Sequence, residues 1–355
     1  MPKRKILFLG ETYRADAITW MNGLKEFGDF EIVTWELNQN NLGLNRIKRI
    51  IEWLLAVIRI KKIVKAHKPD MIIAERTTSY GFLATFSGMK PSAVAQQGMT
   101  DIWPPNSRTK FFKKKLQDYT FKQADLLHAW GELMAEHMKK SGVDMNKVMI
   151  LPKGINLEQF VFESNNTATK INAVVTRTLE PEYCHDVILR AFQLVNQFGV
   201  DFSLTIIGDG SLMDYLKNLS KEYNISNKIT FTGRLDSDKV SQILQESNFY
   251  ISMPVTEGVS ASLFEAMASG CFPVVTDLPG NRNYINNYEN GILIPKGNYI
   301  LLAEEIASAW NRPVWRNEVL KNNRVFVEKY ANYSVNMKII ADKYHEMIDK
   351  SVTSN

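Results

Sequence analysis

The 355-residue sequence contains only two cysteines, Cys184 and Cys271. Two cysteines are too few for the disulfide framework of a small secreted domain, so a reduced, cytoplasmic setting is expected. The sequence also lacks an uninterrupted apolar run near the ~18 residues that cross a bilayer. Its first apolar run, after the basic tip MPKRK, has only five residues. Such a run is too short for a signal peptide and is typical of a first β-strand.

The net charge is small, +5 at neutral pH, but it is unevenly distributed. Residues 1–150 hold 24 Lys and Arg against 15 Asp and Glu, which gives +9, and the remainder holds 19 against 23, which gives −4. The basic half could attract an anionic membrane surface or a phosphorylated acceptor, although an ordinary solvated surface explains it equally well. No nucleic-acid motif accompanies this charge, so no nucleic-acid partner is expected.

Short apolar runs alternate with longer helical patterns along two stretches of the chain. In the first stretch the expected strands are KILFLG, EIVTWE, DMIIAE, SAVAQQ, LLHAW and KVMILP. In the second they are INAVVT, FSLTIIG, KITFTG, NFYISM, FPVVTD and GILIP. Expected helices include Arg46–Ala66, Arg108–Gln123 and Glu132–Ser141. This alternation predicts an α/β protein with two parallel sheets covered by helices, and ligands bind beyond the carboxyl ends of such strands.

The polar stretch ESNNTATK after Phe160 has no apolar periodicity and is interpreted as a linker. We therefore predict a first domain over residues 1–160 and a second over 161–332. Residues 333–355 form a tail that looks helical and is followed by no strand, so it is expected to pack back on the first domain. Two such domains face to face would place a site in the cleft that they share.

The segment EGVSASLFEAMASG, which begins at Glu257, follows the expected strand NFYISM after a three-residue connection, Pro254-Val255-Thr256. Gly258 lets the backbone approach a ligand, and Ser260 and Ser262 are able to cap a helix that begins there. Free N–H groups at a helix start favour a diphosphate. Glu257 and Glu265 could both accept hydrogen bonds from sugar hydroxyls. The alternative is an ordinary strand–loop–helix connection with two exposed glutamates.

The pattern Glu-x7-Glu in this setting resembles family 4 of the retaining glycosyltransferases, which have the GT-B fold. The segments LPKGINLEQF, IIGDG, ITFTGRL, PGNRNYI and NGILIPKGN also resemble that family, in order and spacing. The resemblance implies two Rossmann-like domains facing across a cleft, the N-terminal one for the acceptor and the C-terminal one for the donor. It implies a hexosyltransferase that uses a nucleotide-sugar donor, retains the anomeric configuration without a protein nucleophile, and needs no cofactor and no metal.

The same resemblance assigns roles to individual residues. Glu257 would contact the donor sugar and Glu265 the nucleotide ribose. Arg177 would bind the diphosphate, because a guanidinium forks onto phosphate oxygens and stays charged as the leaving group forms. The remaining implied donor-binding residues are Gly258, Val259, Ser260, Ala261, Ser262, Leu263, Tyr183, Gly208 and Arg234.

Three departures from the family pattern stand out. Tyr183 occupies the position of a basic lysine and brings no charge, and His185 is a candidate for supplying the missing one. Gln97 replaces a histidine that faces the donor sugar in the family. The glycine-rich loop after the first strand, which meets the acceptor or the phosphates in the family, is reduced to Gly10-Glu11-Thr12. The sequence therefore does not indicate how an acceptor would bind. The acceptor-side candidates are Gly10, Gln97, Gly98 and Asp101.

Two other functions remain open at this point. Tyr183 and Gln97 would suit a protein that binds sugar nucleotides with little turnover. A different GT-B enzyme, such as an epimerase or a phosphorylase, is the second alternative, although no lysine is placed for pyridoxal phosphate. The partners expected for the transferase are the nucleotide sugar, a glycan or lipid-linked acceptor, and an anionic membrane on whose cytoplasmic face the enzyme would sit peripherally.

Asp236-Ser237-Asp238 has the spacing of a metal-binding triplet known from a different glycosyltransferase fold. Here it lies between an expected strand and the helix Lys239–Ser247, so helix capping is the preferred interpretation. The five histidines show no metal-ligand spacing. Gly208-Asp209-Gly210 lacks the third glycine of a dinucleotide fingerprint, which argues against NAD.

The segment RIKRIIEWLLAVIRIKKIVK has an apolar stripe at helical spacing. The stripe consists of Ile47, Ile50, Ile51, Leu54, Leu55 and Ile58. Such a stripe is expected to pack on the N-terminal sheet. The alternative is a helix lying at a membrane surface, because the segment 53–58 is apolar all round and basic residues flank it. Residues 111–115, FFKKK, repeat the combination of aromatic and basic side chains.

Overall fold

The computed structural model describes residues 3–37, 45–98, 101–102, 109–162, 168–258 and 260–353. The chain folds into two compact units, the first comprising 1–153 with 333–355 and the second comprising 154–332. The first unit therefore gives way to the second between Lys153 and Gly154, before the boundary at 160 that the polar stretch suggested. Most of that predicted linker, residues 163–167, lies outside the described residues.

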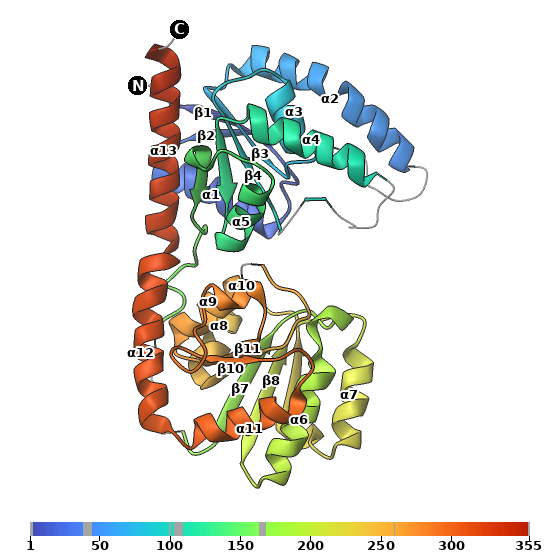
Figure 1. The fold of residues 1–355 in the computed structure, drawn as a ribbon, viewed down its shortest axis with the longest axis vertical. Coiled ribbons are helices and arrows are strands. Elements are labelled where there is room, and N and C mark those ends of the chain that lie inside the picture. The colour runs from blue at the N-terminus through green and yellow to red at the C-terminus, as the bar shows by residue number, and fades with distance from the viewer. Residues whose placement is uncertain are drawn as a thin grey trace. The chain divides into compact units, whose positions relative to one another are not determined.

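The first unit contains a six-stranded parallel sheet in the order β2-β1-β3-β4-β5-β6 (Figure 1). Its strands are β1 Lys5–Leu9, β2 Glu31–Trp35, β3 Met71–Glu75, β4 Ser92–Ala95, β5 Leu126–Ala129 and β6 Val148–Ile150. Its helices are α1 Ala15–Gly28, α2 Asn45–His67, α3 Tyr80–Phe86, α4 Lys110–Gln123, α5 Glu132–Lys140 and α13 Tyr333–Thr353. All residues of β3, β4 and β5 are buried, as expected for parallel strands covered on both faces.

The second unit contains a six-stranded parallel sheet in the order β12-β11-β10-β7-β8-β9. Its strands are β7 Ile171–Thr176, β8 Phe202–Ile207, β9 Ile229–Gly233, β10 Phe249–Ser252, β11 Phe272–Thr276 and β12 Ile292–Ile294. Its helices are α6 His185–Gln197, α7 Met213–Glu222, α8 Ser237–Glu246, α9 Ala261–Ser269, α10 Pro279–Arg282, α11 Tyr299–Trp310 and α12 Pro313–Tyr330. Each strand expected from the sequence is present, and the prediction of two helix-covered parallel sheets is confirmed.

Helix α13 belongs to the first unit although it follows the second unit in the sequence. It packs along α1, where the hydroxyl of Tyr333 donates to the carbonyl oxygen of Thr19 at 2.9 Å. Further along the helix, the buried Tyr344 hydroxyl lies 2.6 Å from Nε2 of His128 in β5. The chain end therefore completes the core of the unit in which the chain begins.

The expected burial of the apolar stripe on α2 is wrong for those members whose side chains are described. Ile51, Leu54, Leu55 and Ile58 are 53%, 63%, 46% and 57% exposed. The helix instead buries the face that carries Ala56 and Ile60. Its inner side meets α3, where the ring of Trp53 stacks on that of Phe82 with centroids 5.5 Å apart. The side chains of Ile47 and Ile50 lie outside the described residues.

In the part of the chain that the structure describes, no helix combines the length and the apolar character needed to cross a membrane.

Candidate active site

The sheet of the second unit has a topological switch point between β7 and β10. From β7 the chain proceeds to β8 and β9 on one side, then crosses over so that β10 pairs on the other side of β7. Ligands of open α/β sheets bind in the crevice beyond the carboxyl ends of the two strands at such a point. Arg177 directly follows β7, and Glu257 lies in the loop after β10. Both predicted catalytic residues therefore flank the switch point.

The side chains of Arg177 and Glu257 are in contact. Nη2 of Arg177 donates to Oε2 of Glu257 and to Oγ of Ser260, and Nε lies 3.4 Å from Oγ of Ser252. The two charged side chains are only 15% and 14% exposed. Mutual pairing keeps both charged groups compensated at this depth, because an unpaired buried charge is costly.

Helix α9 begins at this cluster. Its N-cap, Ser260, accepts a hydrogen bond from the N–H of Leu263 at 3.2 Å, which confirms the predicted capping role. That N–H was predicted to bind diphosphate, but here the cap occupies it. The N–H groups of Ala261 and Ser262 lie in the first turn, where no intrahelical acceptor exists and the helix dipole is positive.

The loop before α9 carries two more predicted donor-binding residues. Oε1 of Glu257 accepts from the N–H of Gly258 at 3.1 Å, so this N–H is also occupied in the structure. Val259 lies outside the described residues. The described part of the loop is therefore held in place by Glu257, which binds both Arg177 and the backbone.

Glu265 lies in the second turn of α9 and is partly buried. Burial raises its pKa to about 7, and the nearby positive charge of Arg177 opposes that rise. A carboxyl group with such a pKa changes its charge near neutral pH. It accepts hydrogen bonds from hydroxyl groups best in its ionised form.

Two glycines allow neighbouring loops to approach the cluster. A Cβ atom on Gly208, after β8, would lie 2.1 Å from the carbonyl oxygen of Arg177, and Gly208 has a φ of +149°. A Cβ atom on Gly280, in α10, would lie 2.4 Å from the carbonyl oxygen of Glu257. Any side chain at either position would displace a residue of the cluster. Sequence reasoning missed Gly280, although the segment PGNRNYI that contains it carried part of the family resemblance.

His185 does not replace the positive charge of the lysine that the family pattern has at the position of Tyr183. Tyr183 ends a short 3₁₀ turn, Pro181–Tyr183, with its ring centroid 5.8 Å from the guanidinium carbon of Arg177. His185 begins α6 and is fully buried. Burial lowers its pKa to about 4. The charge of Arg177 adds to this effect, while the charge of Asp186 and a hydrogen bond with the backbone of Arg177 oppose it. The imidazole is therefore neutral near pH 7, and the suggestion that it supplies the missing charge is wrong.

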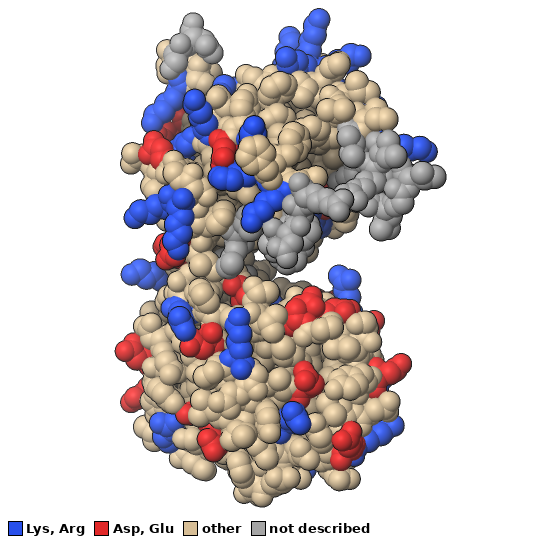
Figure 2. All heavy atoms as spheres, turned by 45° about the vertical axis from the view of Figure 1, so that its right-hand side comes forward, with Lys and Arg blue, Asp and Glu red and all other residues tan. Residues whose placement is uncertain are grey.

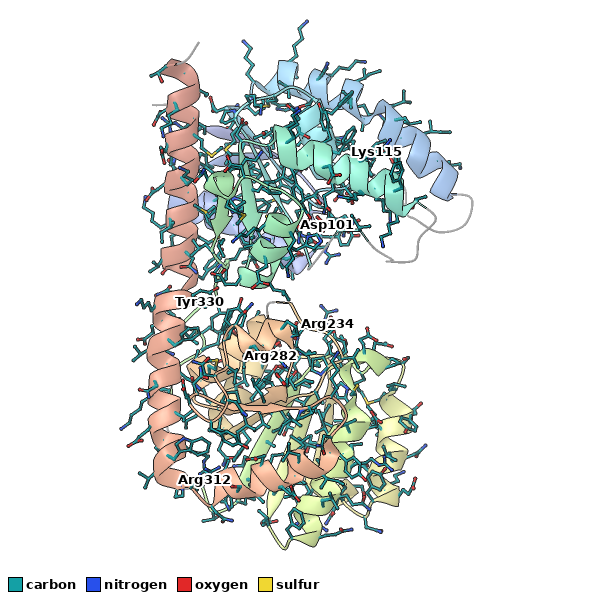
Figure 3. All side chains as sticks on the ribbon, viewed as in Figure 1. Asp101, Lys115, Arg234, Arg282, Arg312 and Tyr330 are labelled. Carbon is teal, nitrogen blue, oxygen red and sulfur yellow. The ribbon has the colours of Figure 1, made fainter. Side chains whose placement is uncertain are left out.

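Arg234 and the triplet Asp236–Asp238 follow β9, and the carbonyl oxygen of Gly233 accepts from the N–H of Gly208 at 2.9 Å. Arg234 is exposed just after the edge strand β9, and β8 separates that strand from β7 (Figure 3). Asp236 caps α8 by accepting from the N–H of Lys239 at 2.9 Å, and this confirms the capping interpretation. Within the described ranges, no group of three or more His, Cys, Asp and Glu side chains is arranged to hold a metal ion.

In the first unit, Asp101 joins two loops (Figure 3). Its carboxylate accepts from the N–H and the hydroxyl of Thr77 after β3, both at 2.7 Å, and from the N–H of Gln97 after β4 at 3.1 Å. Burial raises its pKa, against the effect of these hydrogen bonds. Gly98, next in the same loop, accepts from Nε2 of Gln96 at 2.8 Å. Asp101 and Gly98 thus hold the loops in place.

The first sheet has its own switch point, between β1 and β3, because β2 and β3 lie on opposite sides of β1. Gly10 follows β1, and Glu75 is the last residue of β3. Nε2 of Gln97 donates to Oδ2 of Asp16 at 2.9 Å, and Nζ of Lys153 donates to the carbonyl oxygen of Asp16 at 2.9 Å. The sequence analysis named Gly10 and Gln97 as acceptor-side candidates but missed Glu75, Asp16 and Lys153. The one available signal was the glutamate that ends the otherwise apolar strand Met71–Glu75.

Comparison with protein families assigns both units. Residues 158–326 match the model described as glycosyl transferases group 1, and residues 5–129 match the model described as glycosyl transferase 4-like. The chain is a family 4 glycosyltransferase with the GT-B fold. The resemblance seen in the sequence is thereby confirmed.

Among curated proteins, this glycosyltransferase is similar to the putative colanic acid biosynthesis glycosyltransferase WcaL of Escherichia coli. The two are 27% identical over 53% of this chain and 48% of WcaL. It is also similar to a Campylobacter jejuni enzyme named N-acetylgalactosamine-N,N'-diacetylbacillosaminyl-diphospho-undecaprenol 4-alpha-N-acetylgalactosaminyltransferase. Here the identity is 25% over 72% of this chain and 70% of the relative. The glycosyltransferase spans about half the length of several curated relatives that it matches.

Solved structures share the GT-B fold at low sequence identity. HepE of Anabaena, crystallised with UDP, matches with a TM-score of 0.78 at 13% identity, over 96% of this glycosyltransferase and all of HepE. Sucrose-phosphate synthase of Thermosynechococcus elongatus matches with a TM-score of 0.78 at 14% identity, over 98% of this chain and all of that one.

Proposed function

We propose that this glycosyltransferase moves a sugar from a UDP-sugar to a hydroxyl group of a glycan or a lipid-linked acceptor. We further propose that it retains the anomeric configuration and uses neither a metal nor another cofactor. The observation that carries the proposal is the contact of Arg177, Glu257 and Ser260 at the switch point, one helical turn from Glu265. The choice of uridine is supported by HepE, whose structures contain UDP and UDP-glucose.

The diphosphate of the donor would bind where α9 begins. The N–H groups of Ala261 and Ser262 and the positive helix end favour an anion there. Arg177 lies beside the same turn, and a diphosphate would compete with Glu257 for its guanidinium. Glu257 would then be released to accept hydrogen bonds from the sugar hydroxyls, and Glu265 would accept them from the ribose.

During transfer, the bond between the anomeric carbon and the diphosphate breaks, and the bond to the acceptor oxygen forms on the same face. The proton of the acceptor hydroxyl passes to an oxygen of the departing UDP. Negative charge grows on the diphosphate in this step, and preorganised N–H groups and Arg177 stabilise it as it develops. The helix end and the guanidinium supply the positive potential that a metal ion supplies in other transferases.

A thermal-shift panel tests the donor assignment, because a ligand that binds only the native state raises the melting temperature. UDP and UDP-sugars should stabilise the protein, while GDP, ADP and CDP should not. UDP release should then be measured with lipid-linked and glycan acceptors. Stabilisation by UDP-sugars without UDP release would favour the alternative of a sugar-nucleotide-binding protein. The absence of a shift with every uridine nucleotide would contradict the proposed donor.

The second part of the proposal is peripheral association of the first unit with an anionic membrane that carries the acceptor. The named Campylobacter enzyme acts on a diphospho-undecaprenol-linked sugar, which is a lipid-linked acceptor. The outer face of α2 exposes Ile51, Leu54, Leu55 and Ile58. We call these four side chains the α2 apolar face. Side chains of this kind insert at the boundary between headgroups and acyl chains.

Helix α4 of the same unit also exposes aromatic and basic groups. Phe111 and Phe112 are 71% and 56% exposed, and Nζ of Lys115 lies 4.6 Å from the ring centroid of Phe111 (Figure 3). Figure 2 shows lysine and arginine side chains projecting from the face of the first unit that is in view. Each basic side chain near an anionic leaflet contributes about 1 kcal/mol, and salt screens this attraction.

Co-sedimentation with vesicles of phosphatidylglycerol and phosphatidylcholine tests this surface. Replacing Leu54 and Leu55 together with serine should lower the pelleted fraction at every salt concentration. Replacing residues 113–115 with glutamate should lower it most at low salt. Phe198→Ser removes an apolar side chain that is 50% exposed in the second unit, and should change nothing. If the wild-type protein does not pellet even at low salt, the membrane part of the proposal is wrong.

A further inference from the structure

We infer that Ser252 is a positioning residue for the transfer reaction, because its hydroxyl holds Nε of Arg177 while the outer end of the guanidinium exchanges Glu257 for the diphosphate. The inference rests on the proposed function and adds a residue to the donor site. Ser252 would act only through Arg177 and is assigned no contact with the donor itself.

The backbone of Ser252 is held by its neighbours in the second unit. Ser252 is the last residue of β10 and is 3% exposed, and it pairs with Val275 of β11 in parallel register. Its carbonyl oxygen accepts from the hydroxyl of Thr276 at 3.4 Å, and the carbonyl oxygen of Thr276 accepts from Nδ2 of Asn281 at 2.8 Å. A side chain attached to such a fixed point is able to define the position of a flexible partner.

The hydroxyl of Ser252 binds one edge of the guanidinium together with a second hydroxyl. Oγ of Ser252 accepts from Nε of Arg177 at 3.4 Å, and Oγ of Ser260, the N-cap of α9, accepts from Nη2. Nε and Nη2 share one edge of the planar group. Nη1 makes no hydrogen bond to any residue that the structure describes, so its N–H groups are available to phosphate oxygens.

Hydroxyl groups hold the guanidinium without cancelling its charge. Nη2 also donates to Oε2 of Glu257, whose negative charge compensates that of Arg177. When the diphosphate displaces this carboxylate, Ser252 would keep Nε in place, and the positive charge would meet the negative charge that develops on the leaving group. A second carboxylate in place of Ser252 would bind Nε more strongly but would weaken that stabilisation. A neutral acceptor therefore suits this arginine.

Ser252→Thr and Ser252→Val test this role as a matched pair, because the two side chains have nearly the same shape and only threonine carries a hydroxyl. UDP release should be measured with UDP-glucose, UDP-galactose and UDP-N-acetylglucosamine, each with octyl α-glucoside and octyl α-galactoside, and the combination that the wild type uses fastest is kept. The kcat of Ser252→Val should be about tenfold below that of Ser252→Thr, the effect of one hydrogen bond to a charged group. KM for the UDP-sugar should differ by less than about threefold, because the lost contact matters most when charge develops.

A spectroscopic measurement detects the hydrogen bond directly and does not depend on turnover. In isotope-labelled protein with saturating UDP, the NMR signal of the Nε–H group of Arg177 is the one that disappears in Arg177→Met. Its exchange with water should be about tenfold faster in Ser252→Val than in Ser252→Thr, since only threonine protects this N–H group.

The Arg177→Met background also shows whether Ser252 acts through the arginine. With every N–H of the guanidinium removed, Ser252→Val and Ser252→Thr should have equal kcat values, because the effects of coupled residues are not additive. A remaining advantage of threonine would mean that Ser252 acts on another group.

Ser220→Ala is the control, because this 2%-exposed serine of the same unit donates its hydroxyl within α7, to the carbonyl oxygen of Lys217 at 2.7 Å. It should change neither kcat nor the Arg177 signal, whereas Ser252→Ala, which adds no volume, should resemble Ser252→Val. Absence of UDP release by the wild type with every donor and acceptor would contradict the proposed function, and the exchange measurement would still decide the role of Ser252. If Ser252→Val equals Ser252→Thr in the kcat of an active enzyme, or in the exchange rate of the Nε–H group, the role of Ser252 is wrong.

Discussion

Replacing Glu265 with glutamine should stabilise the protein and weaken donor binding at the same time. The folded-state pKa of Glu265 is about 7, against an ordinary value of 4.5, because of burial. The folded state therefore keeps a proton that the unfolded state has released, and stability falls as pH rises from about 4.5 to about 7. The full difference corresponds to at most about 3 kcal/mol above pH 7. Glu265→Gln removes this cost, so its free energy of unfolding should exceed that of the wild type by about 1–3 kcal/mol at about pH 8.

Binding should change in the opposite direction. An ionised Glu265 accepts hydrogen bonds from the ribose hydroxyls, and the loss of such a bond to a charged group costs about 1.5–3 kcal/mol. UDP-glucose is the suitable ligand because its diphosphate is esterified at both ends and does not titrate between about pH 5 and pH 8. Calorimetric titration should show weaker binding to Glu265→Gln at about pH 8 and nearly equal binding at about pH 5, where Glu265 is protonated in the wild type.

Urea denaturation at the two pH values measures the stability part of this prediction. The matched control is Glu222→Gln, at the exposed end of α7, which should alter neither stability nor affinity. A variant that loses stability at about pH 8, or that binds UDP-glucose as tightly as the wild type there, would refute the reasoning. The first result would mean that burial does not disfavour the charge, and the second that the ribose lies elsewhere.

Three further changes test the rest of the donor site. Arg177→Gln should slow UDP release at least ~100-fold, as for the loss of a preorganised hydrogen-bond donor, and should lower the melting temperature because Glu257 loses its partner. Adding Glu257→Gln should restore the melting temperature but not turnover. Recovery of turnover in the double variant would contradict the role of Arg177. Turnover should persist in excess EDTA, since Arg177 and the start of α9 supply the positive potential; loss of activity with rescue by manganese would overturn metal independence. Tyr183→Lys should raise kcat/KM about tenfold in steady-state assays, because it places a second cation near Arg177. An unchanged or lower kcat/KM would show that this position does not face the leaving group.

The elements that sequence predicts well are those whose signal is local. Central strands such as β3 and β10 are short apolar runs, because central parallel strands are buried on both faces, and each run is visible without knowledge of its neighbours. The start of α9 is equally local, since Glu257, Ser260 and Glu265 lie within nine residues of one another. Arg177 was located only through the family resemblance.

The features that were missed depend on how distant segments meet. Helical periodicity shows that α2 has an apolar stripe, but it does not show on which side the rest of the unit lies. The stripe is exposed because the helix stacks Trp53 on Phe82 of α3 and buries the face that carries Ala56 and Ile60 instead. Glu75 and Lys153 come close only through the tertiary packing of the first unit, in which Lys153 bonds to the backbone of Asp16. The neutrality of His185 follows from its burial, which depends on the packing of α6.

The crystal structure of the protein bound to UDP is the measurement that tests the central claim most directly. The account predicts a diphosphate bound by the N–H groups of Ala261 and Ser262, with Arg177 turned from Glu257 onto its oxygens and the ribose on Glu265. UDP bound anywhere other than the switch point between β7 and β10, or bound there with Arg177 still paired to Glu257, would contradict it.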